Sequence, residues 1–209
     1  MKVHTKESQA TMTPEKALQF LREGNERFQN NLKANRNLLQ QINDTRDGQF
    51  PFAIILSCID SRVSAELVFD QGLGDIFSVR IAGNFVNEDI LGSMEFACKL
   101  AGTKLIVVLG HTSCGAIKGA CDQARLGNLT KLIEKIEPAV YATEEPKEEA
   151  QRNSKNLDFV DAVAAKNVDL TIARVRRESP VLKELEEDGD IKIIGGMYDI
   201  ATGAVEFYN

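Results

Sequence analysis

The chain has 209 residues and a net charge of −6, and hydrophobic residues make up 43% of it. This acidic balance argues against nucleic acid and against an anionic membrane surface as partners. The hydrophobic content is enough for one α/β domain with a packed core, and no apolar run approaches the ~18 residues that span a membrane.

Residues 1–13 are polar and lack the apolar centre of a secretory signal peptide. We therefore expect a flexible tail here and a cytoplasmic, reducing location for the protein. In such a compartment, the four cysteines of the chain indicate metal binding or catalysis more than disulfide bonds.

The first predicted element is a helix over 14–34. Thr13 suits the N-cap of this helix, and Pro14 suits its first position. Its apolar face, centred on Ala17 and Leu21, is narrow. Because so narrow a face does not belong to a central core, we expect the helix to form an arm that packs on a partner subunit.

The rest of the chain alternates strands with helices. After a polar connector, short apolar runs typical of buried strands occur at 52–57, 76–82 and 104–110. Helices are predicted over 63–71 and 90–101, from about 115, and over 156–177 and 180–187. A charged, proline-containing stretch at 137–154 indicates a solvated excursion. The last two runs, 191–200 and 204–208, indicate a closing hairpin.

This alternation predicts an α/β fold with a mainly parallel central sheet, flanking helices, an N-terminal helical arm and a C-terminal hairpin, in a single domain over 1–209. In sheets of this kind, binding sites form beyond the carboxyl ends of the strands. Cys58 follows the first predicted strand and His111 follows the third. If these strands are neighbours, their polar side chains converge.

Two short motifs lie at these strand ends: Cys-Ile-Asp-Ser-Arg at 58–62 and His-Thr-Ser-Cys-Gly at 111–115. Cys58, His111 and Cys114 offer two thiolates and one imidazole, and Asp60 offers a carboxylate that water can displace. Two cysteines and one histidine with an open fourth position are typical of catalytic zinc sites. Cys114 also opens a predicted helix, which favours its thiolate form.

A plainer interpretation stands beside this one, because free cysteine is often a small core residue. Cys98 and Cys121 lie in helical stretches without ligand neighbours and are assigned to the core. Asp60 and Arg62 can pair directly. That pair is either a solvated surface salt bridge, which contributes little, or a switch that decides whether the carboxylate or water reaches the metal.

The paired motifs, Cys-x-Asp-Ser-Arg and Gly-His-x-x-Cys-Gly, resemble those of β-class carbonic anhydrases, most strongly over 47–120. The plant-like subgroup is the better match, because the bicarbonate-inhibited subgroup uses a tryptophan and this chain has none. The resemblance implies reversible hydration of CO2 to bicarbonate and a proton by zinc-bound hydroxide. Zinc lowers the pKa of a bound water, as carbonic anhydrases exemplify.

The resemblance also implies roles for single residues. Cys58, His111 and Cys114 match the permanent zinc ligands. Asp60 and Arg62 match a catalytic dyad that keeps the metal open to water, with Asp60 a zinc ligand only in the closed state.

Four further positions match substrate-binding residues of the family: Gln49, Phe77, Ala82 and Gly115. Gln49 matches a glutamine that reaches substrate from the neighbouring subunit, which implies a homodimer or a dimer of dimers. Phe77 and Ala82 fall where the family lines an apolar CO2 pocket, although plain core packing explains each of them equally well. Phe96 stands where plant-like members often have a tyrosine.

Two other functions stay open at this point. A hydrolase acting on carbonyl sulfide or carbon disulfide would use the same ligands, so the motifs do not exclude it. A zinc-stabilised regulatory protein without turnover is disfavoured, because Asp60, Arg62 and Gln49 are all present.

Overall fold

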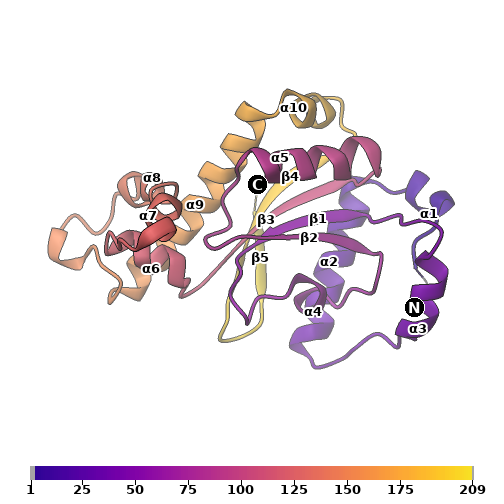
Figure 1. The fold of residues 1–209 in the computed structure, drawn as a ribbon. Helices are drawn as coiled ribbons and strands as arrows, with labels where there is room; N and C mark the ends of the chain where they lie inside the picture. The colour runs from indigo at the N-terminus through magenta and orange to yellow at the C-terminus, as the bar shows by residue number, and fades with distance from the viewer. Residues whose placement is uncertain (1–2, 209) are drawn as a thin grey trace.

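The computed structural model describes residues 3–208 and contains a single five-stranded sheet (Figure 1). Its strand order is β2-β1-β3-β4-β5, and the strands are β1 (Ala53–Ser57), β2 (Ile76–Arg80), β3 (Leu105–His111), β4 (Lys192–Tyr198) and β5 (Val205–Tyr208). The first four strands run parallel, and β5 pairs antiparallel with β4. The predicted fold class is confirmed, and β1 and β3 are neighbours as the convergence of the two motifs requires.

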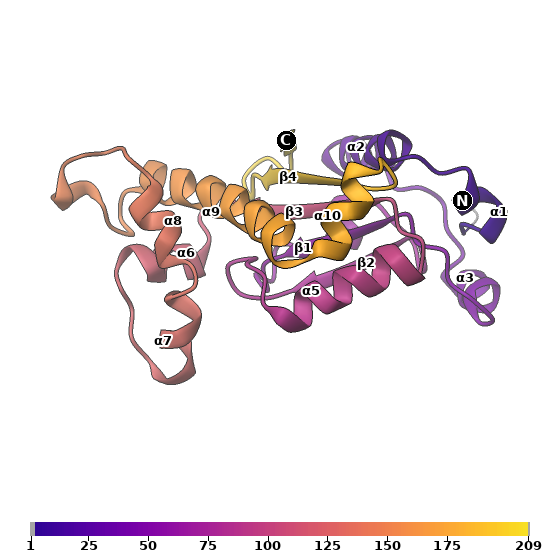
Figure 2. The same cartoon turned by 90° about the horizontal axis from the view of Figure 1, so that it is seen from above.

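Helices cover both faces of the sheet (Figure 2). One face carries α2 (Pro14–Gln29) and α4 (Ala65–Val68). The other carries α5 (Glu88–Glu95), its π-helical extension Phe96–Leu100, α9 (Leu157–Glu178) and α10 (Pro180–Glu187). Within the described residues, no helix is both long and apolar enough to cross a membrane.

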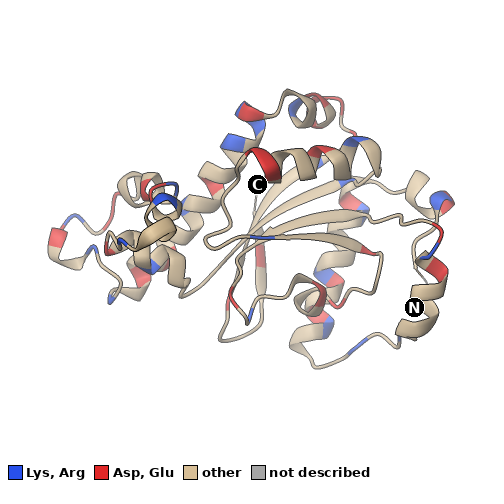
Figure 3. Cartoon of the chain, in the orientation of Figure 1, with Lys and Arg blue, Asp and Glu red and all other residues tan. Residues whose placement is uncertain are grey.

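The central strands are buried on both faces. In β1, Ile54 and Leu56 pack toward α5 and α9, and Ala53 and Ile55 pack toward α2. This double burial explains why the strands are continuous apolar runs rather than alternating ones. Charged residues accordingly gather on helices and loops and are rare on the strands (Figure 3).

The narrow apolar face of α2 was expected not to belong to the core, but it packs on the sheet of its own chain. Ala17 and Leu21 are fully buried there. A Cβ at Gly24 would lie 1.8 Å from the carbonyl oxygen of Phe69. Gly24 therefore lets α2 approach the end of α4 closely, while Ala17 and Leu21 fill the space against the sheet. Contact of this helix with a partner subunit stays a prediction.

The expected tail and connector both contain helices. Residues 6–10 form α1 (Lys6–Ala10), and Gln9 Nε2 donates to the carbonyls of Pro51 and Ala101, which ties this segment to the domain. Residues 1 and 2 of that tail lie outside the described part. The connector contains α3 (Leu38–Thr45), with Asn37 as N-cap. Its apolar side chains, Leu38, Leu39 and Ile42, are all more than half exposed.

A helical lobe lies beyond the carboxyl ends of the strands (Figures 1 and 2). It consists of α6 (Gly115–Cys121), α7 (Gly127–Ile133), α8 (Glu137–Ala142) and the first half of α9, and it has its own apolar core. The predicted solvated excursion at 137–154 therefore begins with a helix. Ala139 and Val140 of α8 are buried against α6 and α9, and only the following loop is mostly exposed.

A buried ion cluster fixes the chain between α2 and α3. Asp70 is 8% exposed and accepts hydrogen bonds from Arg27, from Arg36 and from the backbone N–H of Ala34. Arg36 also donates to the backbone carbonyl of Asp70. Burial alone would raise the pKa of Asp70, but these hydrogen bonds together outweigh it and lower the pKa below its ordinary value.

We expect Asp70→Asn to destabilise the fold by about 3–5 kcal/mol, because two guanidinium groups lose their buried counter-charge. Asn tolerates the φ of +44° at this position, so the backbone itself should be unaffected. Since the pKa of Asp70 is depressed in the folded state, its contribution is present above the unfolded pKa of about 3.9 and is lost as the pH falls below it. Urea unfolding between neutral and acidic pH measures this. A variant within about 0.5 kcal/mol of the parent would contradict the assignment.

Candidate metal centre

Cys58, His111 and Cys114 meet at the carboxyl ends of β1 and β3. Their ligand atoms all lie within 4.8 Å of one another, and all three residues are buried. The Sγ atoms of Cys58 and Cys114 are 3.8 Å apart. Two thiolates bound tetrahedrally to zinc, at about 2.3 Å each, stand about 3.8 Å apart, so the spacing of the cysteines fits this ion.

The imidazole of His111 is oriented for metal binding. Its Nδ1 lies 2.9 Å from the carbonyl oxygen of Thr112, so Nδ1 carries the proton and donates to that carbonyl. Nε2 is buried and has no hydrogen-bond partner within residues 3–208. A buried imidazole nitrogen without a hydrogen-bond partner, within 4.8 Å of two thiol sulfurs, is placed to act as a metal ligand.

The thiols of Cys58 and Cys114 lie within hydrogen-bond distance of each other. A hydrogen bond from Cys114, aided by the backbone N–H of Gly83, lowers the pKa of Cys58. We expected the start of α6 to lower the pKa of Cys114, but its hydrogen bond to Cys58 and its burial raise that pKa instead. The backbone N–H groups of α6 act in the expected direction but are outweighed. A coordinated cation would displace the remaining proton, because a thiol that binds a metal is deprotonated.

Asp60 faces Arg62 in a two-pronged contact. The Nε and Nη2 atoms of Arg62 lie 2.9 and 2.7 Å from the two carboxylate oxygens of Asp60, and the Arg62 backbone N–H also donates to Asp60. These hydrogen bonds hold the pKa of Asp60 well below its usual range. In this arrangement the carboxylate is engaged by the guanidinium and does not join the cysteines and His111.

Backbone contacts fix the loops that carry the ligands. Arg80, at the end of β2, donates to the carbonyls of Cys58 and Asp60 at 3.0 and 2.7 Å. Thr112 is held by β4, because its backbone N–H donates to the carbonyl of Tyr198 at 3.0 Å. The metal ligands therefore stand on loops whose course is set by neighbouring strands.

A pocket of ≈ 350 Å³ opens beside Cys58 and Asp60. Ala82 and Gly115, two of the predicted substrate-binding residues, line it. The remaining lining residues are Ile59, Ala116, Gly119, Leu129 and Ile133. The pocket is thus mostly apolar, and Cys58 is the candidate metal ligand that lines it. α7, which the sequence did not predict, supplies Leu129 and Ile133.

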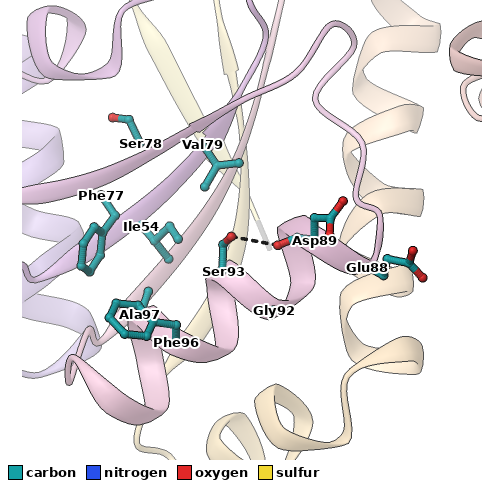
Figure 4. Close-up of a pocket in the computed structure, with 10 residues that line it drawn as sticks. All are labelled: Ile54, Phe77, Ser78, Val79, Glu88, Asp89, Gly92, Ser93, Phe96 and Ala97. Atoms are coloured by element: carbon teal, nitrogen blue, oxygen red, sulfur yellow. Dashed lines mark hydrogen bonds between the residues drawn. The ribbon is translucent and has the colours of Figure 1, made fainter. Parts of the chain in front are cut away.

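Gln49 and Phe77 lie at the opposite end of the sheet from the cluster in the same chain. Gln49 is exposed and precedes β1, whereas Cys58 follows it. Phe77 pairs with Ile54 near the start of β1 and lines a separate pocket with Phe96 (Figure 4). The two aromatic rings meet edge to face at 6.4 Å. Five strand residues span about 17 Å, so neither side chain reaches the cluster of its own subunit.

Four residues around the ligands were not assigned a role from the sequence: Arg80, Gly83, Asp161 and Asn167. Arg80 could have been suspected from the sequence, because it is a charged residue near the carboxyl end of a predicted strand, where binding sites form in such sheets. Asp161 and Asn167 lie in α9, and nothing in the local sequence connects that helix with the two motifs.

Comparison with known proteins places this site in a family. Residues 53–205 match the family model described as carbonic anhydrase. A carbonic anhydrase of Mycolicibacterium smegmatis is 34% identical over 200 residues, which cover 92% of each chain. Carbonic anhydrase 2 of Mycobacterium tuberculosis is 36% identical over 199 residues, covering 91% of this chain and 90% of the relative.

A solved structure supports the fold. One of two tetrameric β-carbonic anhydrases from Sordaria macrospora superimposes with a TM-score of 0.72 over 80% of this chain and 85% of its own. Its sequence identity of 24% makes this a likeness of fold.

Proposed function

Since the chain belongs to the β-class carbonic anhydrase family and is therefore a lyase acting on CO2, we propose that it hydrates CO2 reversibly to bicarbonate and a proton at a zinc ion held by Cys58, His111 and Cys114. The observation that carries the proposal is the buried cluster of two thiols and an unpartnered imidazole nitrogen beside an apolar pocket. When bound, the ion would supply Lewis acidity and would acidify a coordinated water.

The residues around this cluster support chemistry on a small, apolar substrate. CO2 has no net dipole, so the apolar lining formed by Ala82, Leu129 and Ile133 suits it better than a polar one. Gly115 leaves the lining open, because a Cβ there would meet nothing within 4 Å.

We propose that Asp60 orients the nucleophile and that Arg62 keeps Asp60 in place. The carboxylate is ionised, because the hydrogen bonds from Arg62 depress its pKa. An ionised carboxylate accepts a hydrogen bond and can hold a water in a fixed orientation. The same bonds from Arg62 compete with the alternative in which Asp60 turns to the metal and closes the site.

A direct assay tests this function. CO2 hydration by the purified protein, followed by stopped-flow with a pH indicator, should accompany about one zinc per chain. Carbonyl sulfide measured beside CO2 decides between the proposed reaction and the hydrolase alternative. A protein that binds zinc and turns over neither substrate would contradict the proposed activity.

The proposal includes a homodimer or a dimer of dimers. Gln49 and Phe77 lie too far from the cluster of their own chain, so any role of theirs at a catalytic site requires a second subunit. α3 supports an assembly of this kind, because Leu38, Leu39 and Ile42 form an exposed apolar face. The Sordaria macrospora relative is tetrameric.

A subunit-mixing experiment tests whether Gln49 acts across the interface. Gln49→Ala and Cys58→Ser should each be poorly active alone. In a hybrid of the two, the Cys58→Ser subunit supplies Gln49 to the intact metal site of the other, so part of the activity should return. The control is a hybrid of wild type with the double variant, in which no site has both groups. A control hybrid as active as the test hybrid or more active, or an active monomer in sedimentation velocity, would contradict the cross-subunit role.

A further inference from the structure

The helix α9 passes directly behind the metal centre. It packs along the end of β3, where Gly110 precedes the ligand His111. A Cβ on Gly110 would lie 2.8 Å from Cγ2 of Val168 and 3.6 Å from the carbonyl oxygen of Ala164, both in α9. The helix therefore lies as close to the ligand-bearing strand as a glycine permits, and its polar side chains can reach the ligand loops.

Asn167 connects α9 to the loop beside Cys58. It is 3% exposed, and its Nδ2 donates to the carbonyl oxygen of Gly83 at 2.8 Å. The backbone N–H of Gly83 in turn points to Sγ of Cys58 at 3.4 Å. These two bonds lie on the two peptide units that flank the Gly83 Cα, and its φ of +78° is one that glycine adopts readily. Asn167 thus fixes the backbone N–H that donates to the sulfur of Cys58.

Asp161 connects the same helix to the second ligand loop. Its Oδ1 accepts a hydrogen bond from the backbone N–H of Ser113 at 2.7 Å. Ser113 has a φ of +55°, a left-handed conformation that costs a non-glycine residue free energy and persists only where the surroundings hold it. Ser113 directly precedes Cys114, so the bond to Asp161 sets the direction in which that thiol leaves the loop.

We propose that Asp161 and Asn167 are positioning residues that hold Cys58 and Cys114 in metal-binding geometry through the backbone of Gly83 and Ser113. Neither side chain touches a ligand atom. Both hold loops whose conformation would otherwise change. Replacing residues that hold metal ligands in place without touching the metal typically changes metal affinity or activity by about 10–100-fold. The inference rests on the proposed function in one respect, which is that the cluster binds a metal.

The test compares zinc affinity in competition with a chromogenic chelator for Asn167→Ala and Asp161→Ala. We expect zinc affinity to fall about 10–100-fold in each. Asp161→Asn should restore most of it, because the amide Oδ1 still accepts from Ser113. Asn25→Ala is the matched control. Asn25 is also 3% exposed and its Nδ2 also donates to backbone carbonyls, those of Val68 and Gly203, but it lies on α2, away from the cluster.

The second readout is the cobalt-substituted protein, whose thiolate-to-metal absorption reports ligand geometry. The absorption should shift in Asn167→Ala and Asp161→Ala and stay at its parental position in Asn25→Ala, even if all three lose thermal stability. Parental zinc affinity and absorption in both α9 variants would overturn the inference. If Asn167→Ala does not fold, the comparison of Asp161→Ala with Asp161→Asn decides alone. A parent protein that binds no zinc would instead refute the proposed metal site.

Discussion

Replacing Cys58 by serine should remove most of the bound zinc and nearly all CO2 hydration. A neutral hydroxyl replaces a thiol whose pKa is already lowered by Cys114 and by the N–H of Gly83, and a hydroxyl does not ionise to a comparable ligand. Since even outer-sphere partners cost about 10–100-fold, the loss of a direct ligand should exceed a hundredfold in zinc affinity. Metal analysis of the purified variant beside a stopped-flow assay measures both effects.

The matched control for this variant is Cys98→Ser, the same substitution at another buried cysteine. Burial raises the pKa of Cys98 to about 12, so it stays a neutral thiol and no thiolate is lost on replacement. Cys98→Ser should keep one zinc per chain and its activity, at some expense in stability. Full zinc occupancy in Cys58→Ser would refute the ligand assignment.

Replacing Arg62 by alanine should abolish most activity while the zinc is retained. Without the contacts at 2.9 and 2.7 Å, only the backbone N–H of residue 62 still donates to the Asp60 carboxylate, which can then turn to bind the metal and exclude water. We expect a loss on the order of 10²-fold, the lower end of what a positioned proton-accepting group contributes. Asp60→Asn should also keep zinc and lose activity, because an amide is a poorer ligand and a misoriented acceptor. Zinc retention separates both variants from Cys58→Ser.

The pH dependence gives a further distinction. Hydrogen bonds from Arg62 keep the pKa of Asp60 well below its usual range, so Asp60 stays ionised through the neutral-to-alkaline range. Activity of the parent should therefore rise with pH over this range as the nucleophilic water loses its proton, and not because Asp60 titrates. Arg125→Ala, which removes a similarly exposed guanidinium from its ion pair with Glu137, is the control. Near-parental turnover by Arg62→Ala at every pH would contradict the proposal that Arg62 keeps Asp60 from closing the site.

Much of the fold and the metal ligands could be predicted from the sequence because local patterns carry them. β1 and β3 are buried on both faces, so their residues are continuous apolar runs that stand out in the sequence. Cys58 and His111 lie at strand ends, and parallel neighbouring strands bring their carboxyl ends to one edge of a sheet. The paired motifs therefore predict the cluster from the sequence alone. The location in the cytoplasm stays a prediction.

Only the tertiary structure decided the surroundings of that cluster. Gly24 lets α2 lie against the end of α4 on the sheet, a fact that depends on where Phe69 lies. α3 and α7 are short helices, whose stability comes from caps and tertiary packing more than from their own sequence. Asp161 and Asn167 bond to loops that are distant in the chain. They bond to backbone groups, which every residue has, so no residue pattern predicts these contacts. The motifs thus predict which residues are the metal ligands. The positions of those ligands depend on packing between segments that are distant in the chain.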